Sequence, residues 1–194
     1  MRVMILRHAP PLTGGTLAGR LDVAADCSDD AAMGWMAAQI ASVTGMTPQV
    51  WCSAARRCQQ TAAALSLTPA RVEPALWEQD YGAWEGLAYA DLPDLGPLPP
   101  EALARHRPKG GESFLDMAAR VQPVLAGLRE DTLIVGHAGT VRAGLALVVG
   151  AQALSFSVAP LSLTVLRRVG SDGAGADWAV EAVNITAPAV TGPL

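Results

Sequence analysis

Two of the three histidines in this 194-residue chain follow short apolar runs and are flanked by small residues. His8 follows the run Val3–Leu6 and one arginine, and His137 follows the run Thr132–Val135 and one glycine. Wholly apolar runs of this length are typical of strands buried on both faces of a sheet. Because ligands of α/β proteins bind at the carboxyl ends of such strands, we expect both imidazoles to lie at one site.

A histidine beside arginines is suited to phosphoryl transfer. A neutral imidazole can attack phosphorus and divide the transfer of a phosphoryl group to water into two easier steps. The transferred group spreads its charge over its oxygens, and the planar fork of an arginine binds two of them at once. Arg7, Arg56 and Arg57 are the candidate arginines. The pattern predicts an enzyme that handles phosphate, with His8 as its nucleophile.

The sequence lacks the residue patterns that other classes of phosphate-handling enzyme require. A cysteine phosphatase needs an arginine six positions after its cysteine, and none of Cys27, Cys52 and Cys58 has one. A metal-dependent hydrolase needs closely spaced His, Asp and Glu ligands, and a phosphate loop needs a Gly-x-x-x-x-Gly-Lys run; the sequence has neither pattern. We therefore expect neither a metal nor a cofactor.

The elements that must position these residues alternate along the chain. Up to a strand near Arg71, apolar runs and apolar residues at helical spacing predict the order strand, helix, strand and helix. Further along, they predict a capped helix that begins at Ser113, a strand before His137 and a helix that ends near Val149. Two later runs, Leu161–Val169 and Trp178–Ile185, predict further strands. This order predicts an α/β fold, a three-layer α/β/α sandwich with a largely parallel central sheet.

One domain is expected to span residues 1–194, with two irregular stretches. The proline-rich segment from about 87 to 109 is expected to be an irregular insertion over the surface, and about 186–194 a C-terminal tail. Ala143–Leu166 lacks charged residues over a length that could cross a bilayer. Its glycine, proline and serine residues instead indicate a helix, a turn and a strand in succession, so no membrane span is expected.

Charge and cysteine content limit the partners and the compartment. The net charge is −4 and there are no runs of like charge, so the sequence indicates no basic surface that would bind a polyanion. We therefore expect a small phosphorylated substrate and no nucleic acid. Three cysteines without metal-ligand spacing, and an N-terminal apolar run too short for a signal peptide, indicate the cytoplasm. A homodimer remains an alternative to a monomer.

Five segments of the chain match, in order, the signatures of one family. The signatures are Arg-His-Gly, Ser-Pro-Leu-x-Arg-Ala-x-Gln-Thr-Ala, Glu-x-x-(Phe/Tyr)-Gly-x-Trp-Glu-Gly, Gly-Gly-Glu-Ser and Gly-His-x-Gly-x-x-Arg. The matching segments are Arg7–Ala9, Ser53–Ala62, Glu78–Gly86, Gly110–Ser113 and Gly136–Arg142. Through them the chain resembles the histidine phosphatase superfamily, which includes the cofactor-dependent phosphoglycerate mutases.

The resemblance implies a phosphoglycerate mutase-like fold and a role for each matched residue. His8 would be the phosphorylated nucleophile, with Arg7 and Arg57 as phosphate ligands. His137 would lie beside the transferred phosphoryl group, and Glu78 would be the general acid for the leaving oxygen. The chain is then expected to be a phosphomonoesterase that works through phosphohistidine.

Three assignments remain open from the sequence. Asp80 is an alternative to Glu78 as the proton donor, because spacing does not show which carboxyl group reaches the leaving oxygen. Arg20 and Trp84 are candidates for contacts with the substrate. For Trp84 the alternative is that the ring packs its loop against the core.

The closest subfamily resemblance is to the α-ribazole phosphatases of cobalamin synthesis. It rests on Gly19–Asp22 and Gly110–Ser113. The short chain favours a phosphatase over a mutase, since the mutases carry longer insertions and a C-terminal tail that retain the phosphorylated intermediate. Phosphoglycerate mutase activity and a non-catalytic protein that binds a phosphorylated ligand are the alternatives. The chain departs from the family pattern at Ala9, where relatives have glycine, and at Gly14, where many have an asparagine.

Overall fold

The computed structural model describes residues 1–44, 48–170 and 177–188. Within them the strands are β1 (Arg2–Arg7), β2 (Gln49–Ser53), β3 (Arg71–Glu73), β4 (Thr132–Gly136), β5 (Leu163–Val169) and β6 (Asp177–Ile185). The α-helices are α1 (Asp30–Thr44), α2 (Arg56–Ala64), α3 (Pro100–Arg105), α4 (Phe114–Gly127) and α5 (Ala138–Val149). Short 3-10 helices are η1 (Pro74–Leu76), η2 (Gly82–Trp84), η3 (Tyr89–Asp91) and η4 (Gly150–Ser155).

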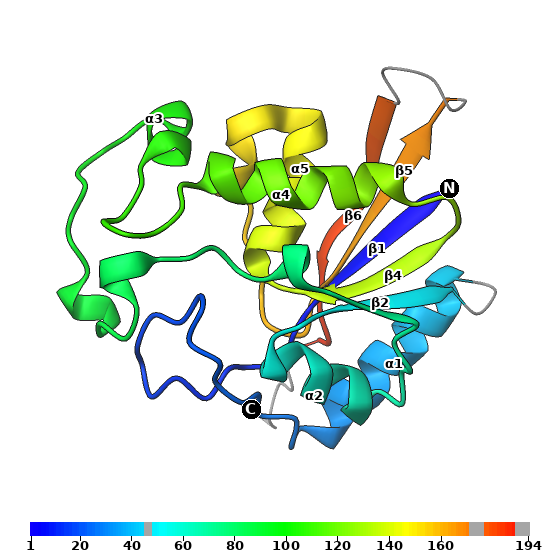
Figure 1. The fold of residues 1–194 in the computed structure, drawn as a ribbon. Coiled ribbons are helices and arrows are strands. Elements are labelled where there is room, and N and C mark those ends of the chain that lie inside the picture. The colour runs from blue at the N-terminus through cyan, green and yellow to red at the C-terminus, as the bar shows by residue number, and fades with distance from the viewer. Residues whose placement is uncertain (45–47, 171–176, 189–194) are drawn as a thin grey trace, which may run out of the picture.

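All six strands belong to one sheet, in the order β3-β2-β4-β1-β5-β6 (Figure 1). The neighbours from β3 to β1 run parallel, whereas β5 is antiparallel to β1 and to β6. The expected largely parallel sheet is therefore confirmed, and β5 is the one described strand that runs against the others. Because β1 and β4 are parallel neighbours, the residues that follow them lie at the same edge of the sheet.

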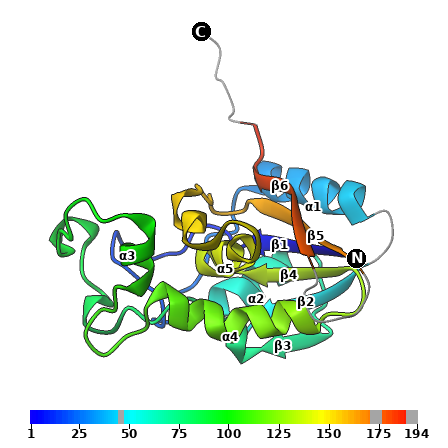
Figure 2. The same cartoon turned by 90° about the horizontal axis from the view of Figure 1, so that it is seen from above.

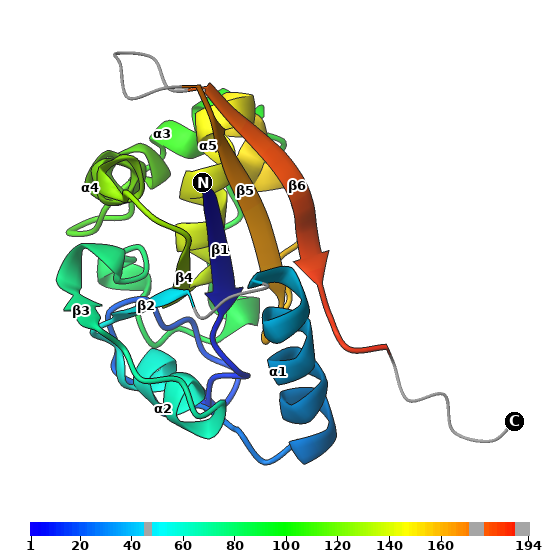
Figure 3. The ribbon, with the colours of Figure 1, turned by 90° about the vertical axis from the view of Figure 1, so that its right-hand side faces the viewer.

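Each face of the sheet is covered by helices, as Figure 3 shows. Alternate residues of β1 point to opposite faces: Val3 and Ile5 belong to the hydrophobic cluster that includes α4 and α5, and Met4 and Leu6 to the cluster that includes α1 and α2. Burial on both faces explains why the strand is wholly apolar. The three-layer sandwich expected from the sequence is confirmed.

The segment 87–109 is less irregular than expected. It contains η3 and α3, which begins with a proline at its first position, where a missing N–H costs no hydrogen bond. Figure 2 shows α3 set off to one side of the sheet. The expected helix cap is confirmed: the Ser113 side chain accepts from the Asp116 N–H, and the Asp116 carboxylate accepts from the Ser113 N–H. Residues 186–188 are without regular structure, and the rest of the expected tail lies outside the described residues.

The apolar stretch after His137 is divided as expected into a helix, a turn and a strand. Residues Ala138–Ser155 are long and apolar enough to cross a membrane by length and composition, with a mean hydropathy of 1.2 and 39% of the stretch buried. In the fold they form α5 and η4, and α5 contributes Val141 and Leu145 to the hydrophobic cluster shared with α4. The chain then turns into β5.

Candidate active site

The two histidines meet at the carboxyl edge of the sheet. His8 follows β1, and His137 follows β4 and caps the amino end of α5. Arg7 is paired with Gly136 in the parallel register of the two strands. The imidazole centroids are consequently 5.2 Å apart, with the rings at 71° to each other.

Hydrogen bonds fix the orientation and the tautomer of His8. Its backbone N–H donates to the Gly136 carbonyl (2.9 Å), and its carbonyl accepts from the Leu161 N–H (3.1 Å). Its Nδ1 lies 2.7 Å from the carbonyl oxygen of Ala9. Since a carbonyl can only accept, Nδ1 carries the ring proton, and Nε2 keeps the lone pair that a nucleophile needs.

His8 is held in its neutral form. Burial, aided by the charges of Arg57 and Arg7, lowers the pKa of His8 from 6.5 to about 3, although the hydrogen bond to Ala9 opposes this shift. The side chain is only 3% exposed. At neutral pH the imidazole is therefore uncharged and able to attack.

This depressed pKa predicts a loss of stability in acid. Between pH 6.5 and pH 3 the unfolded chain binds a proton at position 8 that the folded chain does not bind, so the free energy of unfolding falls as the pH falls. From pH 7 to pH 5 we expect the wild type to lose about 2 kcal/mol relative to His8→Gln. Urea denaturation of both proteins at the two pH values measures this difference. A difference that does not change with pH would show that His8 is not buried in its neutral form.

His137 is also buried and neutral. Its side chain is fully buried, and Nε2 lies 2.9 Å from the Ser53 hydroxyl oxygen and 3.4 Å from the Cys58 sulfur. Burial first, and then the proximity of His8 and nearby arginines, lowers the pKa of His137 well below 6.5. A neutral, fixed imidazole beside His8 can act as a hydrogen-bond donor to an oxygen of the reacting group.

Of the two adjacent arginines, Arg57 lies in the site. It is 1% exposed in the first turn of α2, and its guanidinium donates to the carbonyls of Gly19 (2.7 Å) and Leu21 (3.0 Å). Arg56 is exposed, and its backbone N–H donates to the Asp22 carboxylate (2.7 Å). The sequence register that selects Arg57 agrees with this difference in burial.

Arg7 adds a second, half-buried cation. Its guanidinium donates to the Val158 carbonyl at 2.5 Å, and its Nε is buried without a hydrogen-bond partner in the described structure. Burial lowers the pKa of Arg7; the Glu78 carboxylate opposes this shift, and the charge of Arg142 adds to it. Among the described residues, Arg7, Arg57 and Arg142 form no salt bridge with a carboxylate. Buried and half-buried cations without carboxylate partners make an anion site.

Glu78 is the better placed of the two candidate carboxylates. It is 7% exposed, and it accepts from the backbone N–H of Gly139 (3.2 Å), in the first turn of α5, and of Gln79 (2.9 Å). The Asp80 carboxylate instead accepts from the N–H of Gly82 (2.8 Å), within its own turn. The geometry favours Glu78 as the proton donor.

The close approach of Glu78 to α5 requires a glycine at position 139. A Cβ atom there would lie 2.1 Å from Glu78 Oε1 and 2.5 Å from Met117 Cε. Gly139→Ala should therefore displace the carboxylate and reduce kcat/KM for an alkyl phosphate by about 100-fold. Gly34→Ala is the control, because a Cβ at position 34 of α1 meets nothing within 4 Å. Equal activity of the two variants would show that the placement of Glu78 is unimportant.

A carboxylate that the sequence analysis did not single out holds the loop above Arg57. Glu85 accepts the backbone N–H groups of Gly19, Arg20, Leu21 and Tyr81 at 2.8 to 3.1 Å. This role explains the glutamate of the third signature. The loop in turn presents the carbonyls that Arg57 binds.

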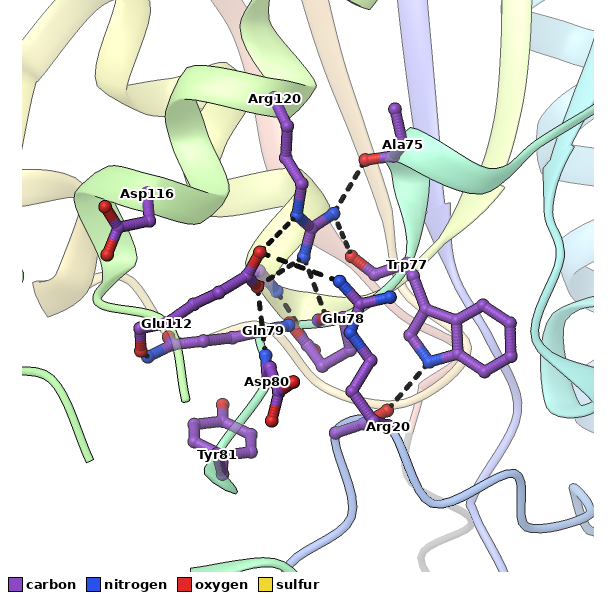
Figure 4. A network of polar contacts seen from close by, with 12 residues as sticks. Arg20, Ala75, Trp77, Glu78, Gln79, Asp80, Tyr81, Glu112, Asp116 and Arg120 are labelled. Carbon is purple, nitrogen blue, oxygen red and sulfur yellow. Dashed lines mark hydrogen bonds and ion pairs between the residues drawn. The ribbon is translucent and has the colours of Figure 1, made fainter. Parts of the chain in front are cut away.

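The two candidate substrate contacts differ in their surroundings. The guanidinium of Arg20 lies 3.6 Å from Glu112 and 5.8 Å from the centre of the Trp77 ring (Figure 4). The ring of Trp84 stacks on His106 at 5.2 Å, so it packs against the proline-rich segment and not against the two hydrophobic clusters of the core. His106 is thus a partly buried packing residue.

No group of His, Cys, Asp and Glu that could hold a metal occurs in the described part of the chain.

One family model and several curated relatives match the chain. The family model of the histidine phosphatase superfamily (branch 1) matches residues 4–186. A 6-phosphofructo-2-kinase/fructose-2,6-bisphosphatase 4 of Rattus norvegicus is 34% identical over 127 residues, 61% of this chain and 27% of the relative. A fructose-2,6-bisphosphatase of Saccharomyces cerevisiae is 34% identical over 101 residues, 48% of this chain and 22% of the relative. The chain therefore spans about a quarter of the length of these curated relatives.

Solved structures match over most of both chains. A mycobacterial glucosyl-3-phosphoglycerate phosphatase superposes with a TM-score of 0.77 and 26% identity, over 96% of this chain and 99% of that one. A second mycobacterial protein, described as a hydrolase, has a TM-score of 0.81 and 25% identity, over 98% and 93% of the two chains. With the family model matched from the first strand to beyond the last, the chain belongs to the histidine phosphatase superfamily.

Proposed function

We propose that this protein is a phosphomonoesterase that works through a phosphohistidine at His8. The observation that carries the proposal is a neutral imidazole with its Nε2 lone pair free, set beside the buried Arg57 and the half-buried Arg7. Neither arginine forms a salt bridge with a carboxylate in the described structure, so both are available to bind a phosphate dianion.

The reaction proceeds in two displacements at phosphorus. In the first, His8 Nε2 bonds to phosphorus while the bond to the leaving oxygen breaks, and the Glu78 carboxyl group gives that oxygen a proton. Arg7, Arg57 and His137 stabilise the charge on the other phosphoryl oxygens. In the second, water attacks phosphorus, the Glu78 carboxylate takes a proton from the water, and His8 departs as a neutral imidazole.

The proposed substrate is a small phosphorylated metabolite such as α-ribazole 5′-phosphate. The similarity of Gly19–Asp22 and Gly110–Ser113 to the α-ribazole phosphatases supports that choice. The names of similar proteins add glucosyl-3-phosphoglycerate and fructose 2,6-bisphosphate as candidates. The free thiols of Cys27, Cys52 and Cys58 suit a reducing compartment, and we propose the cytoplasm.

Phosphate release from a panel of monoesters tests the activity and ranks the substrates. The panel contains the three candidates and 3-phosphoglycerate supplied with its bisphosphate. We expect hydrolysis that depends on His8, and with phosphoglycerate a release of inorganic phosphate that exceeds isomerisation. Efficient isomerisation without phosphate release would indicate a mutase. Binding of these esters without turnover would indicate a non-catalytic member of the fold.

A further inference from the structure

Arg120, on α4, is bonded to the backbone that carries Glu78. Its NH1 donates to the carbonyls of Ala75 (2.7 Å) and Trp77 (2.7 Å), and its NH2 donates to the carbonyl of Glu78 (2.9 Å). Its Nε and NH2 also donate to the two carboxylate oxygens of Glu112 at 2.9 and 2.8 Å. Figure 4 shows the guanidinium between the carboxylate and these carbonyls. Every N–H direction of the fork is thereby used.

Glu112 bonds to the other side of the same segment. Its carboxylate accepts from the Asp80 N–H (3.0 Å), its backbone N–H donates to the Asp80 carbonyl (2.8 Å), and its carbonyl accepts from the Gln79 side-chain amide (2.7 Å). Although burial alone would raise it, the hydrogen bonds from Arg120 and Asp80 lower the pKa of Glu112. The pair thus stays ionised and holds the chain on both sides of Glu78.

The same segment is joined to the phosphate-binding arginine. The Trp77 indole N–H donates to the Gly19 carbonyl at 3.0 Å, and this carbonyl also accepts from Arg57 at 2.7 Å. Arg20, which follows Gly19, approaches Glu112 at 3.6 Å. The backbone that carries the carboxylate and the loop over Arg57 therefore share one set of bonds.

We propose that Arg120 and Glu112 are positioning residues for the proton donor Glu78. Neither of them bonds to His8, Arg7 or Arg57 in the described structure. Their hydrogen bonds go to the backbone of residues 75–80, and through it they fix the position of Glu78. A general acid works only within hydrogen-bonding reach of the leaving oxygen, and a displacement of about 1 Å can cost about 100-fold in rate. This inference rests on the role of Glu78 in the proposed function.

Dependence on the leaving group separates this role from a general structural one. An alkyl alcohol must be protonated as it leaves, whereas p-nitrophenol departs as a stable anion and needs the acid far less. The ratio kcat/KM reports the steps up to departure of the leaving group. Arg120→Lys keeps the charge but cannot reproduce the bonds of the planar fork.

We expect Arg120→Lys to lower kcat/KM for an alkyl phosphate by about 100-fold, and to leave kcat/KM for p-nitrophenyl phosphate within about threefold. Glu112→Gln should show the same selectivity and serves as the second variant if Arg120→Lys does not fold. Added to Glu78→Gln, neither change should increase the loss on the alkyl ester, because the group being positioned is already absent. Arg107→Lys is the control, since its exposed ion pair with Asp116 does not touch the Glu78 segment.

The two possible failures are distinguishable. If Glu78→Gln lowers kcat/KM for both esters equally, Glu78 is not the acid, and both its proposed role and this inference are wrong. If Glu78→Gln is selective but Arg120→Lys and Glu112→Gln affect both esters equally or neither, the inference alone is overturned. A normal melting temperature with a selective loss supports positioning.

Discussion

Replacement of His8 by alanine should reduce kcat/KM for every phosphomonoester by at least about 10⁴-fold. The reason is that the described site has no second imidazole free to replace it, because His137 is fully buried and bonds to Ser53 through Nε2. Steady-state phosphate release from p-nitrophenyl phosphate, at enzyme concentrations high enough to detect residual turnover, measures the loss.

The third histidine provides the control for this variant. His106 stacks on Trp84 and has no role in the proposed reaction, so His106→Ala should retain activity within a few-fold. Thermal unfolding of both variants at neutral pH checks that each is folded. Activity of His8→Ala within about tenfold of the wild type would mean that water attacks the phosphate directly and that no histidine nucleophile is needed.

The second large effect is expected at Arg57. Arg57→Lys keeps one positive charge but loses the planar fork that holds the carbonyls of Gly19 and Leu21 while presenting donors to phosphate. We expect kcat/KM to fall by about 10³-fold, near the lower end of the effects seen when a phosphate-stabilising arginine is lost. Inhibition by inorganic phosphate, measured in parallel, should weaken as well.

Arg56 supplies the matched control for Arg57 because it is the same residue type one position earlier. Its side chain is exposed, and the bond that anchors position 56 comes from its backbone N–H. Arg56→Lys should consequently leave kcat/KM and phosphate inhibition near wild-type values. If Arg56→Lys were the damaging change and Arg57→Lys the harmless one, the assignment of the phosphate-binding arginine would be reversed.

The sheet and the histidine pair were predictable because they depend on local patterns. A run such as Val3–Leu6 is apolar at every position, which is typical of a strand covered on both faces. Since parallel neighbours end at the same edge, placing His8 and His137 after two such strands was enough to predict that they meet. The choice of Arg57 over Arg56 came from the family register alone.

The supports of the site were not predictable, because they depend on contacts between distant loops. Glu85 accepts hydrogen bonds from backbone N–H groups of the loop at 19–21, and Arg120 on α4 donates to the carbonyl of Ala75 in η1. Nothing in the composition around either residue marks it as more than a surface charge, although Glu85 lies in the third signature. Arg142 closes the fifth signature, and its proximity to Arg7 emerged only from the fold. Ser53, which begins the second signature, likewise gained its contact with His137 only there.

Isolation of the phosphorylated enzyme tests the central claim most directly. Wild-type protein mixed with a ³²P-labelled monoester and quenched in alkali within the first turnover should carry label that is stable in base and lost in acid, attached to Nε2 of His8, and His8→Ala should carry none. Turnover by the wild type with no such label, or label on a residue other than His8, would contradict the account.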